Sequence, residues 1–414
     1  MHSPQTQDTG RFPMREGEFV GLMAMLMALQ ALAIDVMLPA LGVMSRELGV
    51  SDANDRQLVI GVFLVCSGLA SLVPGSIADR FGRRPVILAC LGAYFVISLA
   101  SVFVSDFTHL LVLRALLGLF TSGLMVMPMA VVRDRFEGDR MARTQSLIAM
   151  TFMVVPMLAP LLGQAVMLAA GWRAIFGVMA LLALVFGAWA WLRLPETLHD
   201  DHKQEIRPRV VLANMRTAVT RRDAVGYFLA AALVQGALLG YINSAQQLVA
   251  EALGAGAAFP TIFGVMALLM AATNFVNSRI VERFGARRVS HAALIGYILS
   301  AALHVWFAAT GRETLWVFVL LMTVNMCFMS FIGANFQSIA LQPFARIAGA
   351  AASALSFIRL VAGALLGLLI GQAFDGTAVP ITGAMVLAGL GSLLLVLFSE
   401  KGVLFRRLHY PTYP

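Results

Sequence analysis

Residues 75–85 of this chain read GSIADRFGRRP, and this short loop with its surroundings decides the fold. The apolar runs on either side of the loop are each long enough to cross a bilayer as a helix. A weaker copy, IVERFGARR, follows at residues 280–288, so Asp79 and Glu282 lie 203 positions apart, close to half of the chain. A repeat on this scale, placed between membrane spans, predicts a transporter built from two similar halves.

The composition indicates an all-α integral membrane protein. Hydrophobic residues make up 59% of the chain, charged residues 13%, and the mean hydropathy is +0.83. Soluble domains are roughly a quarter charged, so a soluble class is excluded. The net charge of +8 is spread through short loops, which argues against a nucleic-acid surface. The three cysteines lie in apolar segments without metal or redox spacing, so no metal and no cofactor is expected.

Twelve apolar runs are long enough to span ~30 Å of hydrocarbon as helices, the structure that satisfies its own backbone there. Six form a first half, at roughly 19–43, 57–78, 86–104, 107–132, 144–169 and 174–192. Six more follow at roughly 225–250, 259–279, 289–309, 314–340, 348–371 and 379–399. We therefore expect an N-terminal tail (1–18), a six-helix half (19–192), a central loop (193–223), a second six-helix half (224–400) and a C-terminal tail (401–414).

Basic residues alternate between the expected loops. They are frequent before the first span and after spans two, four, six, eight and twelve, and sparse in the intervening loops. Because cytoplasmic loops carry the excess of lysine and arginine, the central loop and the two tails, with both termini, are expected in the cytoplasm.

Four further motifs lie within or at the end of the expected spans. The first span contains IDVMLPAL at 34–41, and the fourth contains LRALLG at 113–118. The fifth contains VPMLAPLLGQ at 155–164, and the sixth ends in LPETL at 194–198. With the repeated loop, these motifs resemble the major facilitator superfamily over essentially the whole chain. Within it they are similar to the drug:proton antiporters of the bicyclomycin- and chloramphenicol-resistance type, and Pro156, Pro160 and Gly163 of the fifth span resemble the antiporter motif.

This resemblance implies a proton-coupled exporter of small amphipathic or aromatic drugs, such as amphenicols, in the bacterial inner membrane. Its expected partners are the drug, protons and the lipid bilayer, with the proton as coupling ion; the expected state is a monomer. A proton-driven importer of a nutrient or metabolite on the same fold is the first alternative, and a transport-inactive membrane sensor is the second. An enzyme is disfavoured because no nucleophile–base set shares a depth in the membrane.

Asp35 is the only acid within the hydrocarbon part of the first half. An ionised carboxylate is unfavourable there, so the group is suited to taking up and losing a proton. Arg114 is its expected partner, because each lies about eight residues, or ~12 Å, from the periplasmic end of its own helix. The alternatives are a purely structural acid and an arginine that only braces two helices.

Other polar and thioether side chains within the spans are candidates for the substrate cavity. Gln235 and Gln246 share one face of span seven and are expected to point inward together, although such amides also join helices. Arg359, near the middle of span eleven, either faces the cavity and attracts an anionic or dipolar substrate or is braced by span ten. The candidates are Asp35, Met37, Arg114, Met125, Met157, Gln235, Asn243, Gln246, Asn325 and Arg359.

The loop of the opening motif is expected to control access from the cytoplasm. Asp79 ends a helix, where the macrodipole is negative, so it needs a cation or a helix N-terminus as partner. The family resemblance suggests Arg133 or the start of span eleven for this role, in a cluster that closes the cytoplasmic side. The candidate gating residues are Gly75, Asp79, Arg80, Gly82, Arg83, Arg84 and Arg133.

Overall fold

The computed structural model describes residues 14–136, 138–198, 216 and 220–405. Within these ranges the chain is helical and contains no strand. Eleven helices are long and apolar enough to cross a membrane, and a bent pair of shorter helices makes a twelfth span. The all-α fold of about twelve spans is therefore confirmed. The expected tails and central loop lie largely outside the described residues.

The structure describes eight helices in the first half, of which α2 is a short continuation of the first span. Their bounds are α1 Glu16–Asp35, α2 Leu41–Glu47, α3 Leu58–Ala70, α4 Val73–Phe81, α5 Arg83–Val102, α6 Phe107–Arg135, α7 Gly138–Ala170 and α8 Arg173–Arg193. Short 3₁₀ turns, Leu38–Ala40 and Asp55–Gln57, precede α2 and α3. The spans expected at 19–43 and 57–78 are thus each broken, the first by the turn at Pro39 and the second by a 48° bend before Pro74.

The second half repeats this plan with six long helices. Their bounds are α10 Arg222–Ala245, α11 Phe259–Phe284, α12 Ala286–Ala309, α13 Leu315–Leu341, α14 Ala348–Gln372 and α15 Val379–Ser399. A π-helical turn, Gln246–Ala252, extends α10, and a 3₁₀ turn, Gln342–Ile347, separates α13 from α14.

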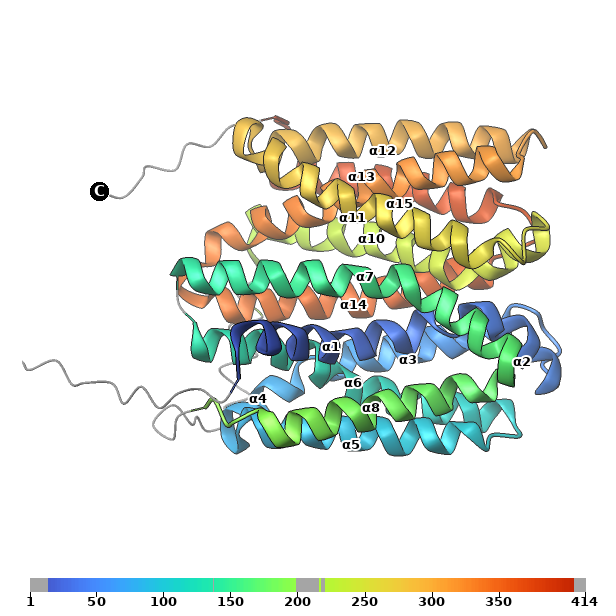
Figure 1. Cartoon of the computed structure of the whole chain (residues 1–414). Coiled ribbons are helices and arrows are strands. Elements are labelled where there is room, and N and C mark those ends of the chain that lie inside the picture. Colours follow the sequence, from blue (N-terminus) through green and yellow to red (C-terminus); the bar gives the residue numbers. More distant parts are fainter. Residues whose placement is uncertain (1–13, 137, 199–215, 217–219, 406–414) are drawn as a thin grey trace, which may run out of the picture.

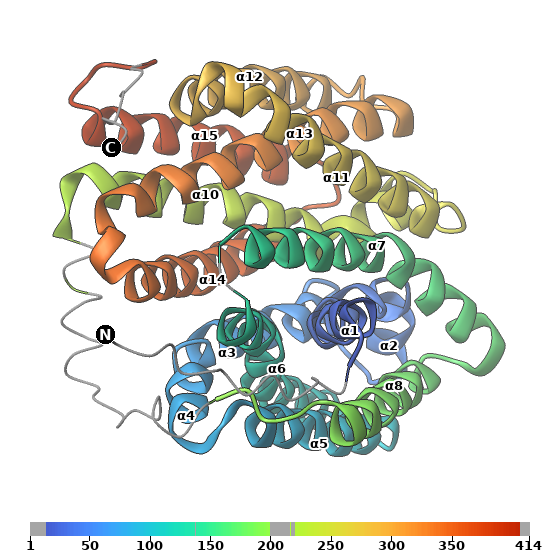
Figure 2. The same cartoon turned by 60° about the vertical axis from the view of Figure 1, so that its left-hand side comes forward.

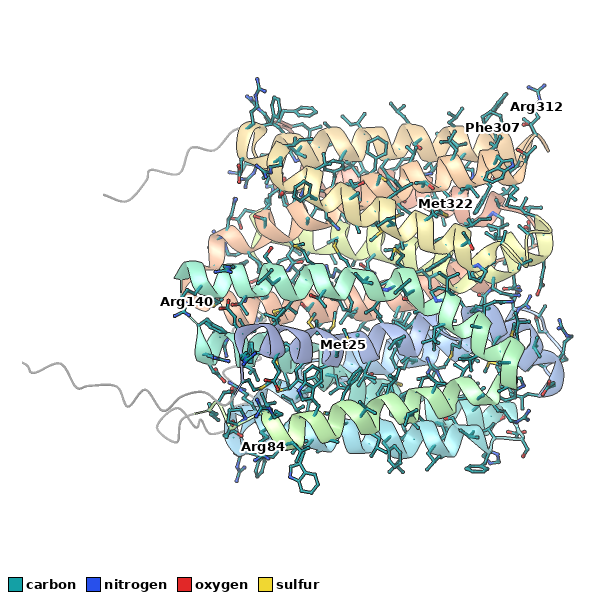
Figure 3. The ribbon with its side chains drawn as sticks, in the orientation of Figure 1. Met25, Arg84, Arg140, Phe307, Arg312 and Met322 are labelled. Atoms are coloured by element: carbon teal, nitrogen blue, oxygen red, sulfur yellow. The ribbon has the colours of Figure 1, made fainter. Side chains whose placement is uncertain are left out.

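The helices run side by side, and in Figure 1 most of the second half lies above most of the first half, with α7 and α14 between them. The end at which α1 begins and α15 ends is called the terminal end here, and the other is called the opposite end. Figure 3 shows Arg84 and Arg140 at the terminal end and Arg312 at the opposite end. The turned view in Figure 2 shows α7 and α14 between the outer helices of the two halves.

Large apolar side chains cover the outside of the helices. Phe103, Leu168, Leu192 and Trp316 each expose between 73 and 79% of their surface. Such exposure in water would be unfavourable over this many residues, whereas lipid chains accept it. The surface therefore identifies a multi-pass membrane protein.

The two halves meet along two helix pairs, α3 with α14 and α7 with α11. A side chain at Gly264 of α11 would clash with the backbone carbonyl of Met157 on α7, so glycine permits this close approach. Of these helices, α7 also packs against α1, which carries Asp35, and α11 and α14 contribute to the lining of a cavity in the second half.

Candidate functional site

Asp35 is the last residue of α1 and lies where the first span is interrupted. Pro39 has no N–H to pair with the carbonyl of Asp35, so the α-helix ends and a 3₁₀ turn leads into α2. The Asp35 side chain is 7% exposed, and no described residue forms a hydrogen bond or ion pair with it. Asp35 is thus an intramembrane acid without a partner among the described residues, and such acids mark functional sites in membrane spans.

The antiporter motif on α7 packs directly against this helix break. A side chain at Gly163 would collide with the backbone carbonyl of Val36, so only a glycine permits this approach. Pro160 is buried in the same helix one turn earlier, and Pro156 is partly exposed a further turn away. The sequence motif therefore lies beside Asp35, although nothing in the sequence alone indicates this contact.

Arg114 is completely buried but does not pair with Asp35, which corrects the expectation of an ion pair. Its Nη2 donates to the carbonyl of Ala33 at 2.6 Å, and its Nε donates to the carbonyl of Val59 at 3.0 Å. The guanidinium also lies 4.5 Å from the centroid of the Phe63 ring. The carbonyls in the last turn of α1 lack helical partners because the helix ends at Asp35. One of them, the carbonyl of Ala33, accepts the hydrogen bond from Arg114 instead. Arg114 thus joins α6 to α1 and α3.

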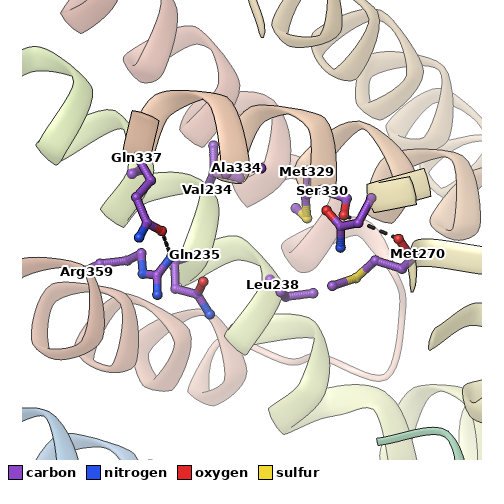
Figure 4. Close-up of a pocket in the computed structure, with 12 residues that line it drawn as sticks. Val234, Gln235, Leu238, Met270, Met329, Ser330, Ala334, Gln337 and Arg359 are labelled. Atoms are coloured by element: carbon purple, nitrogen blue, oxygen red, sulfur yellow. Dashed lines mark hydrogen bonds between the residues drawn. The ribbon is translucent and has the colours of Figure 1, made fainter. Parts of the chain in front are cut away.

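A cavity of about 250 Å³ lies within the second half, between α10, α11, α13 and α14. Arg359 lines it from α14, and Gln235 lines it from α10 (Figure 4). The other lining residues are Ala231, Val234, Leu238, Met270, Asn274, Met329, Ser330, Gly333, Ala334 and Gln337. Arg359 donates to Gln337 Oε1 on α13, the tenth span, at 3.4 Å. It therefore lines the cavity and also contacts a polar group of span ten, although that group is Gln337 and not Asn325.

Besides Asp35 and Arg114, six more of the candidate substrate residues do not line this cavity. Met37, Asn243 and Asn325 are almost fully buried elsewhere, and both side-chain polar atoms of each asparagine lack a hydrogen-bond partner. Gln246 lies at the opposite end and donates to Glu251 at 3.2 Å, so it does not point inward with Gln235. The π-helical turn that begins at Gln246 changes the helical period on which the shared face was based. The full group is Met37, Met125, Met157, Asn243, Gln246 and Asn325.

Asn274, Ser330 and Gln337 line the cavity but were not selected from the sequence. The sequence does contain a feature that could have identified them, because each is a polar residue inside an apolar span, as Gln235 is. Their inward orientation depends on helix rotation, which the apolar runs do not fix.

A polar cluster joins the two halves at the opposite end, and we call it the inter-half latch. Arg56 and Glu251 form a bidentate ion pair, with N···O distances of 2.6 and 2.7 Å. Gln247 accepts from Gln57 and donates to Asn54 at 2.9 Å, and Asn54 also donates to the carbonyl of Phe374 at 2.9 Å. Among the described residues, the hydrogen bonds that cross between the halves lie in this cluster. The structure therefore represents a state that is closed at the opposite end.

Asp79 is paired, as the helix-dipole argument requires, but with Arg83 at 2.7 Å rather than with Arg133. Arg83 is buried and also contacts Asp134 at 2.8 Å, whereas Arg133 is exposed. Arg83 stands four residues after Asp79, across the turn at Gly82, where φ is +102°. Asp79 therefore pairs with Arg83, a cation close to it in sequence, and this ion pair lies within the first half.

The remaining gating candidates lie around the same loop. Gly75 has open space beside its Cα, and Arg80 is exposed above the Phe81 ring. Arg84 donates to the carbonyl of Trp191 at 2.6 Å.

In each half, the segment that follows the last helix binds to the loop between the second and third spans of that half. Glu196 accepts from the backbone N–H groups of Arg83 and Arg84, at 2.8 and 3.1 Å, at the N-terminus of α5. In the second half, Glu400 pairs with Arg287 at 2.7 Å and accepts from Tyr227 at 2.7 Å. The sequence repeat therefore has a structural counterpart in both halves.

Two layers of membrane-spanning helices, a polar latch between them and an internal cavity define a membrane transporter. The family model described as Major Facilitator Superfamily matches residues 23–367, and the chain belongs to this family. Its members are transporters and not enzymes.

Several relatives carry names that refer to drug resistance. The chain is 27% identical to a protein named bicyclomycin resistance protein homolog of Haemophilus influenzae, over 87% of this chain and 91% of the relative. It is 28% identical to multidrug resistance protein MdtL of Klebsiella pneumoniae, over 88% and 91% respectively. It is 29% identical to a chloramphenicol resistance protein of Pseudomonas aeruginosa, over 67% of this chain and 66% of that protein.

Solved structures share the fold. The crystal structure of the D-xylose-proton symporter has a TM-score of 0.70 at 14% identity, covering 92% of this chain and 97% of the symporter. A bacterial homolog of the human lysosomal transporter Spinster, crystallised in an inward-facing, unoccupied conformation, has a TM-score of 0.71 at 15% identity, covering 94% and 95%. At these identities the likeness concerns the fold alone.

Proposed function

We propose that this protein is a drug:proton antiporter that exports small amphipathic or aromatic compounds across the bacterial inner membrane. The observation that carries the proposal is Asp35, a buried carboxylate without a partner at the break of the first span. Intramembrane acids in such positions are suited to proton transfer. The drug-resistance names of the relatives support export of drugs, and amphenicols are the first substrates to test.

The proposed cycle alternates access between the two ends of the molecule. We assign the terminal end to the cytoplasm from the arginine pattern, so the inter-half latch closes the periplasmic side in this structure. Drug enters from the cytoplasm while Asp35 is ionised. When the latch opens, a proton from the periplasm reaches Asp35, weakens drug binding and promotes release, so coupling equals the difference in drug affinity between the two protonation states.

Other residues have supporting roles in this proposal. Arg114 holds the end of α1 in place and keeps positive charge near Asp35 without titrating. Gly163, with Pro156 and Pro160, shapes the α7 surface against the break. The loop that contains Asp79 and Arg83 serves as the cytoplasmic gate, and the protein works as a monomer.

The test is drug-induced proton movement in proteoliposomes with an imposed pH gradient. Chloramphenicol added to wild type should move protons opposite to the drug's own direction. Asp35→Asn mimics the protonated form permanently, so it should abolish coupled movement and remove the pH dependence of drug binding. Asp106→Asn is the matched control, because this exposed acid at the opposite end bonds, among the described residues, only within its own helical turn and asparagine keeps that N-cap, so the variant should behave like wild type.

Two results would contradict the proposal. Proton movement in the same direction as the drug would make the protein an importer, and an unchanged signal in Asp35→Asn would remove Asp35 from the mechanism.

A further inference from the structure

The cavity of the second half has an unusual balance of charge. Arg359 is its only charged lining residue, and no acid is present among the twelve residues that line it. The remaining polar groups are the amides of Gln235, Asn274 and Gln337 and the hydroxyl of Ser330. The cavity therefore carries a formal charge of +1 inside a span where charge is unfavourable unless it is compensated.

The guanidinium of Arg359 has unused hydrogen-bonding capacity. It can donate five hydrogen bonds, yet its one described bond is the long contact of 3.4 Å to Gln337 Oε1. Its Nε is buried and has no partner. A partly buried arginine in this condition leaves donors free for an acceptor that the cavity itself does not supply.

The charged group of the cavity lies at one end and the two methionines lie at the other. Figure 4 shows Arg359, Gln337 and Gln235 together at one end, while Met329 and Met270 lie at the other with Ser330, whose hydroxyl donates to the carbonyl of Met270 at 3.3 Å. Planar guanidinium groups match carboxylates, and thioether side chains adapt to varied apolar bodies. This arrangement fits a molecule that has an anionic group on one side and an aromatic or aliphatic body on the other.

We infer that this cavity binds amphipathic anions, and that Arg359 makes it prefer an aromatic carboxylate to a neutral or cationic analogue of the same size. The inference deepens the proposed export function by naming the charge class of the cargo, and it rests on that function for its physiological meaning. The binding preference itself follows from the cavity and does not depend on proton coupling.

The test compares three probes of one shape: 2-naphthoate, 2-naphthamide and 2-naphthylmethylammonium. Binding to the full-length protein in nanodiscs is measured by equilibrium dialysis, with empty nanodiscs subtracted. A hydrogen bond to a charged group is worth about 1.5–3 kcal/mol, so wild type should bind the carboxylate roughly tenfold or more tighter than the amide. The ammonium should bind most weakly because it faces Arg359.

Variants at one position separate charge from structure. Arg359→Gln should remove the preference for the carboxylate, whereas Arg359→Lys should retain the order of the three probes with a smaller difference. Arg279→Gln, which removes an exposed arginine on α11, is the matched control and should bind as wild type does. Equal binding of the three probes to wild type, or an unchanged preference in Arg359→Gln, would overturn the inference.

The two proposals fail separately. Asp35→Asn should keep the preference for 2-naphthoate, since Asp35 does not line this cavity. Loss of proton coupling with the preference intact concerns the proposed function, and loss of the preference with coupling intact concerns this inference alone.

Discussion

Breaking the Arg56–Glu251 ion pair should shift the protein towards a state that is open at the opposite end. The pair is bidentate, and its side chains are 5% and 45% exposed. Fully exposed pairs contribute about 0.2–1 kcal/mol, and hydrogen bonds to charged groups contribute up to about 3 kcal/mol. Because Glu251 is nearly half exposed, we assign about 1–2 kcal/mol to the interaction.

That free energy sets the size of the expected change. Since the pair joins the halves only while this end is closed, Glu251→Gln should raise the ratio of open to closed molecules roughly 5–30-fold. The charge exchange Arg56→Glu with Glu251→Arg should restore much of the closed state, because it reverses the pair without removing it.

Distances between spin labels at Ser51 and Ala257 would measure this ratio. Both positions are exposed at the opposite end, one in each half, and the three free cysteines are first replaced. The reasoning is refuted if Glu251→Gln gives the wild-type distance distribution, or if the charge exchange is no better than either single variant.

Two further predictions concern topology and packing. Reporter fusions should read as periplasmic at Asp52, Ala255 and Gly376 and as cytoplasmic at Gly138 and Lys203, and one reversed reporter in the first half would overturn the orientation. Gly163→Ala places a methyl group against the carbonyl of Val36, so it should lower the melting temperature by an amount equivalent to about 1–3 kcal/mol and impair transport. Gly177→Ala on α8, where nothing lies within 4 Å, is its control; equal melting temperatures would refute the packing argument.

The sequence allowed the helices and the deep charged residues to be predicted. Apolar length locates a span, and a charge within a span is conspicuous, so Asp35, Arg114 and Arg359 were identified as functional candidates. Their partners were harder to predict. Arg114 binds the carbonyl of Ala33 because α1 ends at Asp35, and a helix end is not visible in hydropathy.

The inter-half latch was not predicted at all. Asn54, Gln247 and Glu251 are polar residues near loops, and such residues are ordinarily solvated. Their pairing depends on how two halves, nearly 200 residues apart in sequence, approach one another. The pairing of Asp79 with Arg83, by contrast, could have been read from their spacing of four residues.

The ties made by Glu196 and Glu400 have a mechanical consequence. Each fastens the exit of a half to the turn between its second and third spans, so the last helix of each six-helix unit is bound to an earlier turn of the same unit. A half restrained in this way should move as one rigid body. The conformational change of each transport cycle is then concentrated at the interface between the two halves, where a small number of side chains can determine its rate.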